Sequence, residues 1–254
     1  MLRFSLLALA LLLSVSARAQ TGSDALITEG LELLHQGHSS ADVSALNRAR
    51  TLFIRAASGP DEYLAQYYAA LAANRIATLL MDEDVERADR FIDDAIERLQ
   101  RSAELNERFA EAPILLSSVY GTKIAVRPRM AMVLSPRAQR AVDDAERLDA
   151  SNPRLALVQG ISLYHTPEQW GGSKTGALER LDAAICQFQE AKNASSLAPS
   201  WGYDEALAWK GSTLLALGRA EEAVRTYGQA LRVNPEYAWV REVLLPEARR
   251  KASP

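Results

Sequence analysis

The most constraining feature of the chain is the spacing of small and large apolar residues between Asp204 and Pro235. Counted from Asp204 as position 1, large residues stand at positions 4, 11 and 24, and small ones at 8, 15, 20 and 27. In chain order these are Leu207, Gly211, Leu214, Gly218, Ala223, Tyr227 and Ala230. The three- and four-residue spacing is that of a helix face, and Gly218 and Pro235 are residues that end helices. The segment is therefore predicted to be two antiparallel helices that approach closely at the small residues.

Weaker copies of the pattern precede this segment. The residues that mark them are Ala49, Phe53, Ala56, Ala88, Ile92, Ala95, Ala141, Ala145, Leu148, Gly160, Leu163, Ala177, Leu181 and Ala184. Within one copy, His165 to Gly172 is expected to form a longer loop. We expect five helix pairs and a terminal helix from Tyr237 to about Lys251. Because such pairs cannot bury their apolar faces alone, they are predicted to stack into one right-handed, all-α solenoid.

The pattern between Asp204 and Pro235 resembles the tetratricopeptide repeat (TPR), a 34-residue helix–turn–helix unit. Over roughly residues 110 to 245 the chain is also similar to a group of exported bacterial TPR proteins. That likeness is carried by the segments 123–128, 164–172, 199–203 and 237–240, including a Thr-Pro-x-x-aromatic-Gly-Gly loop. The Gly-Gly loop is further similar to one in the TPR component associated with TRAP transporters. The TPR resemblance implies a concave face lined by the first helix of each pair.

The first nineteen residues have the pattern of a secretory signal peptide. Arg3 provides a positive start, and the apolar run from Leu6 to Leu13 is shorter than the ~20 residues of a membrane-spanning helix. Ala17 and Ala19 are the small residues that a signal peptidase reads. We expect residues 1–19 to be removed after Ala19, which leaves a TPR-like domain over 20–254 in the periplasm or outside the cell. A membrane anchor at this end is the alternative.

The charge balance and the single cysteine exclude several classes of function. Twenty-nine basic against 32 acidic residues give a net charge of −3. No basic surface is therefore expected that could neutralise nucleic-acid phosphates. The only cysteine, Cys186, cannot form an internal disulfide, and it is predicted to be a buried, inert thiol within a helix.

No residue set has the spacing of a catalytic, metal or cofactor site. His35 and His38 could share a helix face, but no third ligand lies near them in sequence, and Gly37 indicates a solvated helix end. The segment 171–174 lacks the second glycine and the preceding strand of a phosphate-binding loop, so Ser173 is predicted to cap the next helix. We therefore expect no enzyme, no metal and no cofactor.

The candidate binding residues lie on or near the expected concave face. Trp209 stands close to a position that lines the concave face in this type of repeat. Tyr164 and Arg154 stand at concave-face positions of the preceding helix pair. Tryptophan and tyrosine often anchor bound partners, although each could instead fill the seam between repeats. The predicted ligand- or partner-binding residues are Arg154, Tyr164, Trp170, Trp201, Glu205 and Trp209.

The segment 127–132, with two arginines and two methionines, allows two interpretations: a loop packed back on the solenoid, or an adaptable contact surface. For the whole chain, the favoured hypothesis is a non-catalytic scaffold that binds a protein or peptide of the cell envelope through its concave face. The first alternative is a small-molecule-binding accessory of an envelope transport system, which would need a closed pocket. The second is an enzyme, which would need polar residues that converge in one cleft.

Overall fold

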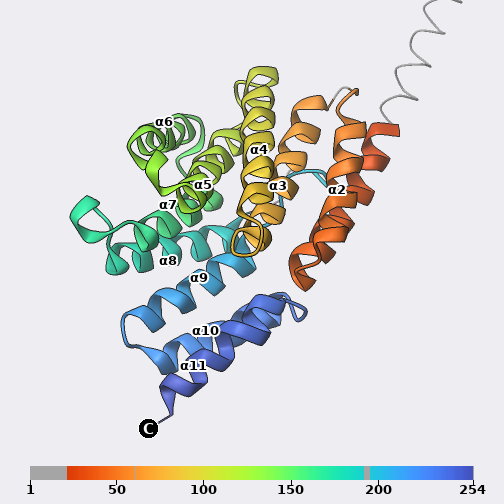
Figure 1. The fold of residues 1–254 in the computed structure, drawn as a ribbon. Coiled ribbons are helices and arrows are strands. Elements are labelled where there is room, and N and C mark those ends of the chain that lie inside the picture. The colour runs from red at the N-terminus through yellow and green to blue at the C-terminus, as the bar shows by residue number, and fades with distance from the viewer. Residues whose placement is uncertain (1–21, 60, 192–194, 254) are drawn as a thin grey trace, which may run out of the picture.

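The computed structural model describes residues 22–59, 61–191 and 195–253, and throughout these ranges the secondary structure is helical, with no strand. The predicted signal peptide, residues 1–19, lies outside the described residues. The helices follow one another in antiparallel pairs along a curved stack (Figure 1). The predicted all-α solenoid is therefore confirmed.

Over the residues that the structure describes, five helix pairs make up the stack, as the residue spacing predicts. The pairs are helical residues 22–40 with α2 (Val43–Ala56), α3 (Glu62–Leu80) with α4 (Val85–Leu105), α5 (Glu111–Val126) with α6 (Ala131–Asp149), α7 (Pro153–His165) with α8 (Lys174–Glu190), and α9 (Tyr203–Ala216) with α10 (Ala220–Val233). Two short 3₁₀ helices, η1 (Pro128–Met130) and η2 (Glu168–Trp170), lie in the turns of the third and fourth pairs.

The chain ends in a helix that changes its winding. Residues Trp239–Leu244 form a π-helical segment, η3, and α11 (Leu245–Ala252) continues from it. Pro246 lies at the start of α11 and has no backbone N–H. Since a proline ring also crowds the carbonyl four residues earlier, the wider turn of a π-helix accommodates it. The expected terminal helix is thus present, and its first half is wider than an α-helix.

The small residues of the repeat lie where two helices of a pair touch. The alanines predicted at the seams, such as Ala49, Ala95 and Ala223, are fully buried. A Cβ atom at Gly211 would lie 2.3 Å from Cε1 of Tyr227, and one at Gly160 would lie 2.8 Å from Cγ of Leu181. The repeat therefore needs a small residue at this position because the facing large residue fills the space.

The first helix is longer than the sequence indicates. It continues past Gly37 to residue 40, and a Cβ at Gly37 would lie 2.7 Å from Cγ of Leu46. This glycine permits close approach of α2 and does not end the helix. The solvated helix end predicted for His38 is wrong, because the His38 side chain is only 13% exposed.

The first helices of successive pairs form an inner layer. α3 contacts α5, α5 contacts α7, and α7 contacts α9. The stack curls so strongly that side chains of the first two pairs contact α9 of the fifth pair. In the described part of the chain, none of the helices combines the length and the apolar character needed to cross a membrane.

Candidate functional site

Residues 195–202, which precede α9, cross the inner layer and occupy part of it. The hydroxyl of Tyr68 on α3 donates a hydrogen bond of 2.6 Å to the carbonyl of Leu197. The guanidinium of Arg154 on α7 donates to the carbonyl of Pro199. We call residues 195–202 the inner strap. Its backbone carbonyls accept hydrogen bonds from side chains of the inner layer, as the carbonyls of a bound extended peptide would.

The side chain of Trp201 fixes the strap to the inner layer. Its Nε1 donates a hydrogen bond of 2.7 Å to the hydroxyl of Tyr67. The guanidinium carbons of Arg75 and Arg154 lie 5.8 and 5.6 Å from its ring centroid, which are cation–π distances. Arg154 also donates to Glu111 at 2.9 Å. The functional groups of Trp201 and Arg154 are therefore engaged inside the protein.

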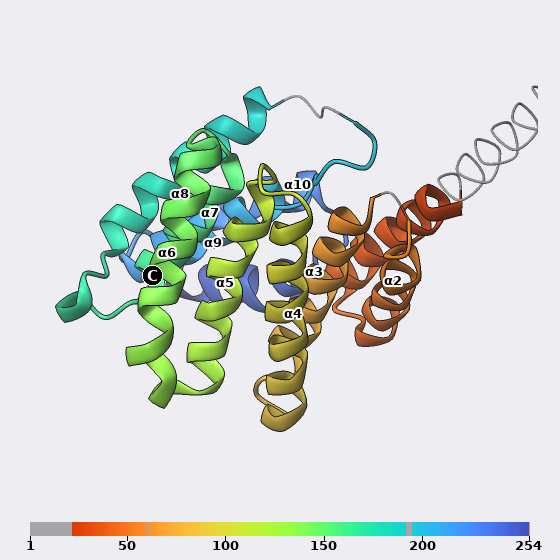
Figure 2. The ribbon, with the colours of Figure 1, turned by 90° about the horizontal axis from the view of Figure 1, so that it is seen from above.

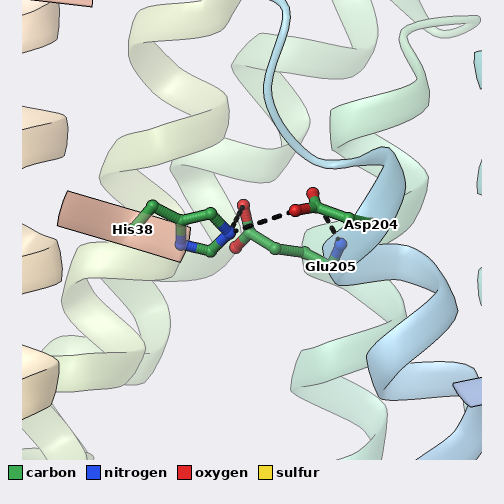
Figure 3. A group of neighbouring side chains, drawn as sticks. All are labelled: His38, Asp204 and Glu205. Atoms are coloured by element: carbon green, nitrogen blue, oxygen red, sulfur yellow. Dashed lines mark hydrogen bonds and ion pairs between the residues drawn. The ribbon is translucent and has the colours of Figure 1, made fainter. Parts of the chain in front are cut away.

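A second internal contact joins the two ends of the solenoid. Nε2 of His38, at the end of the first helix, lies 3.4 Å from Oδ2 of Asp204 and 3.9 Å from Oε1 of Glu205 (Figure 3). Arg75 on α3 donates to Glu205 at 2.7 Å and contacts Nδ1 of His38. Asn234 donates to Asp204 at 2.7 Å. We call these five residues the latch.

The latch contains three side chains of types that bind metals, His38, Asp204 and Glu205, with ligand atoms within 4.8 Å of one another. The surrounding groups do not suit a metal. A metal-bound histidine normally donates its other ring N–H to an acceptor, but Nδ1 of His38 faces Arg75, which can only donate. Arg75 also adds a positive charge beside Glu205. The group is therefore an ion-paired tie between repeats.

The charges of the latch explain the pKa of Asp204. Burial of the carboxyl by itself raises the pKa. The contact with Nε2 of His38, the hydrogen bond of Asn234 and the charge of Arg75 outweigh burial and hold the pKa of Asp204 far below its ordinary value. The carboxylate is consequently ionised in the folded protein at all ordinary pH values.

An aromatic cluster lies at the far end of the inner layer, where α7, α9 and η3 meet. The ring of Trp209 is 5.5 Å from that of Tyr164, 5.0 Å from that of His165 and 5.3 Å from that of Trp239, measured between centroids. His165 is exposed, while Tyr164, Trp209 and Trp239 are partly exposed. These four residues are called the aromatic cluster below. It presents ring edges and faces to solvent.

Lys174 sets the electrostatics of the aromatic cluster. Its ammonium nitrogen lies 3.6 Å from the ring centroid of Tyr164 and donates to the Tyr164 carbonyl. The desolvation of the ring where it packs against Trp209 and Tyr164, together with the charge of Lys174, lowers the pKa of His165 below its ordinary value. The imidazole is therefore neutral near pH 7, and it can both donate and accept a hydrogen bond.

The Gly-Gly loop holds Lys174 in place. Gly171 has a left-handed backbone with φ of 92°, and a Cβ at Gly172 would lie 1.7 Å from the carbonyl oxygen of Thr166. The side chain of Ser173 accepts a hydrogen bond from Gly176, which confirms the predicted helix cap. The longer loop expected within this pair is also confirmed.

The structure distributes the six predicted site residues over four places. Tyr164 and Trp209 meet in the aromatic cluster. Arg154 and Trp201 are engaged with the strap, and Glu205 is engaged in the latch. Trp170 is 72% exposed on η2. The six therefore do not line one continuous groove.

Two features of the candidate site were not predicted from the sequence. Trp239 and His165 both lie in marker segments, but neither was predicted as a binding residue, and the structure places both in the aromatic cluster. The strap has no periodic pattern that could reveal its path. The prediction that Cys186 is buried is wrong: its thiol lies on the outer face of α8 and is exposed.

No protein-family model matches the chain, and no curated protein matches it. Among solved structures, the chain is similar to the HusA haemophore from Porphyromonas gingivalis, with a TM-score of 0.61 and 22% identity over 73% of this chain and 93% of that one. It is also similar to TTC0263, a TPR protein of Thermus thermophilus, with a TM-score of 0.59 and 20% identity over 87% and 99%. This chain has a TPR-like solenoid fold. The suggested likeness to the TRAP-associated component finds no support in these neighbours.

Proposed function

We propose that this chain is a non-catalytic, exported scaffold that binds a protein or peptide segment of the cell envelope through the aromatic cluster. The observation that carries the proposal is the gathering of Tyr164, His165, Trp209 and Trp239 at one place, partly open to solvent. Half-exposed tryptophan and tyrosine side chains offer large contact areas that lose little conformational entropy on binding. The fold supplies a rigid inner layer on which such anchors are held.

The strap restricts where a partner can bind. It already occupies the hydrogen-bonding groups of Tyr68 and Arg154, and the latch occupies Glu205. The remaining predicted anchors on the inner layer are those of the aromatic cluster. A partner segment would therefore dock across α7, α9 and η3, with an apolar or aromatic side chain against Trp209 and a polar group on His165.

A crosslinking experiment in the native host tests this function. The wild type and the variant Tyr164→Ala/His165→Ala would each be crosslinked to neighbouring proteins and isolated. We expect specific envelope partners with the wild type and their loss with the variant, while the helical circular dichroism stays unchanged. Trp170→Ala is the matched control, because Trp170 is exposed outside the cluster. If only Trp170→Ala loses the partners, the binding site lies at the Gly-Gly loop and not at the aromatic cluster.

A second candidate function is the binding of a planar small molecule, as an accessory of an envelope transport system. The neutral imidazole of His165 beside the rings of Tyr164 and Trp209 favours it. Since one structural neighbour is a haemophore, haemin is a suitable probe. Binding would shift the haemin absorption band, and His165→Ala would abolish the shift. An unchanged band with the wild type would leave protein binding as the function.

A further inference from the structure

Two neighbouring turns carry much of the exposed apolar surface. The described residues include ten large hydrophobic side chains that are exposed, and five of them lie at the α3–α4 and α5–α6 turns. These are Leu79, Val85, Met130, Met132 and Val133, of which Met132 is 82% and Val133 is 54% exposed. Figure 2 has both turns at the lower edge of the molecule. Isolated exposed apolar residues are normal, but a gathering of them indicates an interaction site.

The start of α6 is directed outward at this edge. At 100° per residue, Leu134, Ala141 and Ala145 lie on one side of the helix, and all three are buried. Met132 lies on the opposite side, and Val133, Arg137 and Arg140 lie along one flank between the two sides; all four are exposed. The exposed surface of α6 therefore carries apolar and basic side chains next to one another.

The two turns have opposite charges. The α3–α4 turn carries Asp82, Glu83, Asp84 and Glu86, with no basic residue between 82 and 86; we call it the acidic turn. The α5–α6 turn and the start of α6 carry Arg127, Arg129, Arg137 and Arg140, with no acidic residue between 127 and 140; we call this the basic turn. Among the described side chains, Arg129, Arg137 and Arg140 have no carboxylate at ion-pair distance, and neither Asp82 nor Glu83 has a cation there.

Two ion pairs of Arg127 hold the two turns side by side. Arg127 donates to Glu86 at 2.6 Å and to Asp89 at 3.0 Å. Glu86 and Arg127 remain 71% and 33% exposed in this contact. The edge therefore has an acidic part and a basic part that meet at a fixed contact, with the exposed apolar residues of both turns around it.

We propose that this edge is a two-fold interface at which two copies of this chain associate. A two-fold axis places the same surface of each copy against itself in the reverse direction. The acidic turn of one copy then faces the basic turn of the other, and Met132 and Val133 of each copy pack against Leu79 and Val85 of the other. A partner with a single sign of charge would be repelled by one of the two turns, so the second copy is the partner that complements both.

The oligomeric state of the purified mature chain tests this interface without any other partner, and so independently of the proposed function. Sedimentation velocity from micromolar to submillimolar concentration is expected to detect a monomer–dimer equilibrium. Met132→Asp/Val133→Asp should remove the dimer, and because both side chains are exposed, the fold should remain intact. Leu148→Asp/Val243→Asp, which alters two exposed apolar residues elsewhere, should dimerise as the wild type does.

Charge reversal tests the pairing of the two turns. Arg137→Glu/Arg140→Glu reverses two of the four positive charges of the basic turn, and Asp82→Lys/Glu83→Lys reverses two of the four negative charges of the acidic turn, so that each variant loses the charge of one turn and keeps that of the other. Each variant alone should be monomeric, while an equimolar mixture should form a heterodimer. The proposal is overturned if the wild type stays monomeric at submillimolar concentration, if its dimer survives Met132→Asp/Val133→Asp, or if the mixed variants do not associate.

Discussion

At the scale of single residues, the glycines of the chain have two distinct roles. Gly211 lies opposite the buried ring of Tyr227, whereas a Cβ at Gly228, in the same helix as Tyr227, would have no neighbour closer than 3.9 Å. We expect Gly211→Ala to destabilise the protein by ~1–3 kcal/mol, because the added methyl overlaps a ring that cannot move. Urea unfolding followed by circular dichroism measures the change.

Gly228→Ala is the matched control for this prediction. It adds the same methyl to a helix, but without a clash, and it should stabilise the protein by ~0.5–1 kcal/mol through reduced freedom of the unfolded chain. Equal effects of the two substitutions would contradict the assignment of Gly211 to the close contact.

At the scale of elements, the strap is held by few contacts and is the least regular part of the inner layer. Tyr68→Phe removes the hydrogen bond to the Leu197 carbonyl while it keeps the ring. We expect a loss of about 1 kcal/mol in unfolding free energy and faster amide hydrogen exchange within 195–202, because the strap would detach locally. Tyr203→Phe, which removes an exposed contact with Gln189, should leave exchange in the strap unchanged.

At the scale of the whole molecule, the latch joins repeats that a straight solenoid would keep apart. The lowered pKa of Asp204 makes this tie dependent on pH. A carboxyl with a lowered pKa in the folded state stabilises that state above its unfolded pKa of about 4, and this contribution is lost as the pH falls below that value.

The variant Asp204→Asn tests the contribution of the latch to acid stability. We expect it to be less stable than the wild type at pH 7 and to lose less of its unfolding free energy between about pH 4 and pH 2. Urea titrations at a series of pH values measure this. The exposed Asp143→Asn is the control and should follow the wild-type pH curve; an Asp204→Asn curve parallel to the wild type would refute the role of the latch.

The candidate site was predictable in part, for a physical reason. Tyr164 stands on a concave-face position of the repeat register and Trp209 one residue from such a position, and a register carries a residue to the same face of successive helices. Their contact at 5.5 Å agrees with that expectation. Trp239 and His165 lie where the register ends, one beside a π-helix and the other at a loop. No periodicity places such residues, so only the folded chain brings them to Trp209.

The sequence by itself determined the repeating unit of this protein: small residues facing large ones at fixed intervals require paired helices, and paired helices with one apolar seam require a stack. This information is local, because each pair is specified within a few dozen residues. The curvature of the stack is not local. It decided that His38 meets Asp204 and that the strap fills the inner layer beside Arg154. These outcomes depend on small rotations between successive pairs that accumulate along the chain, and only the tertiary structure contains their sum.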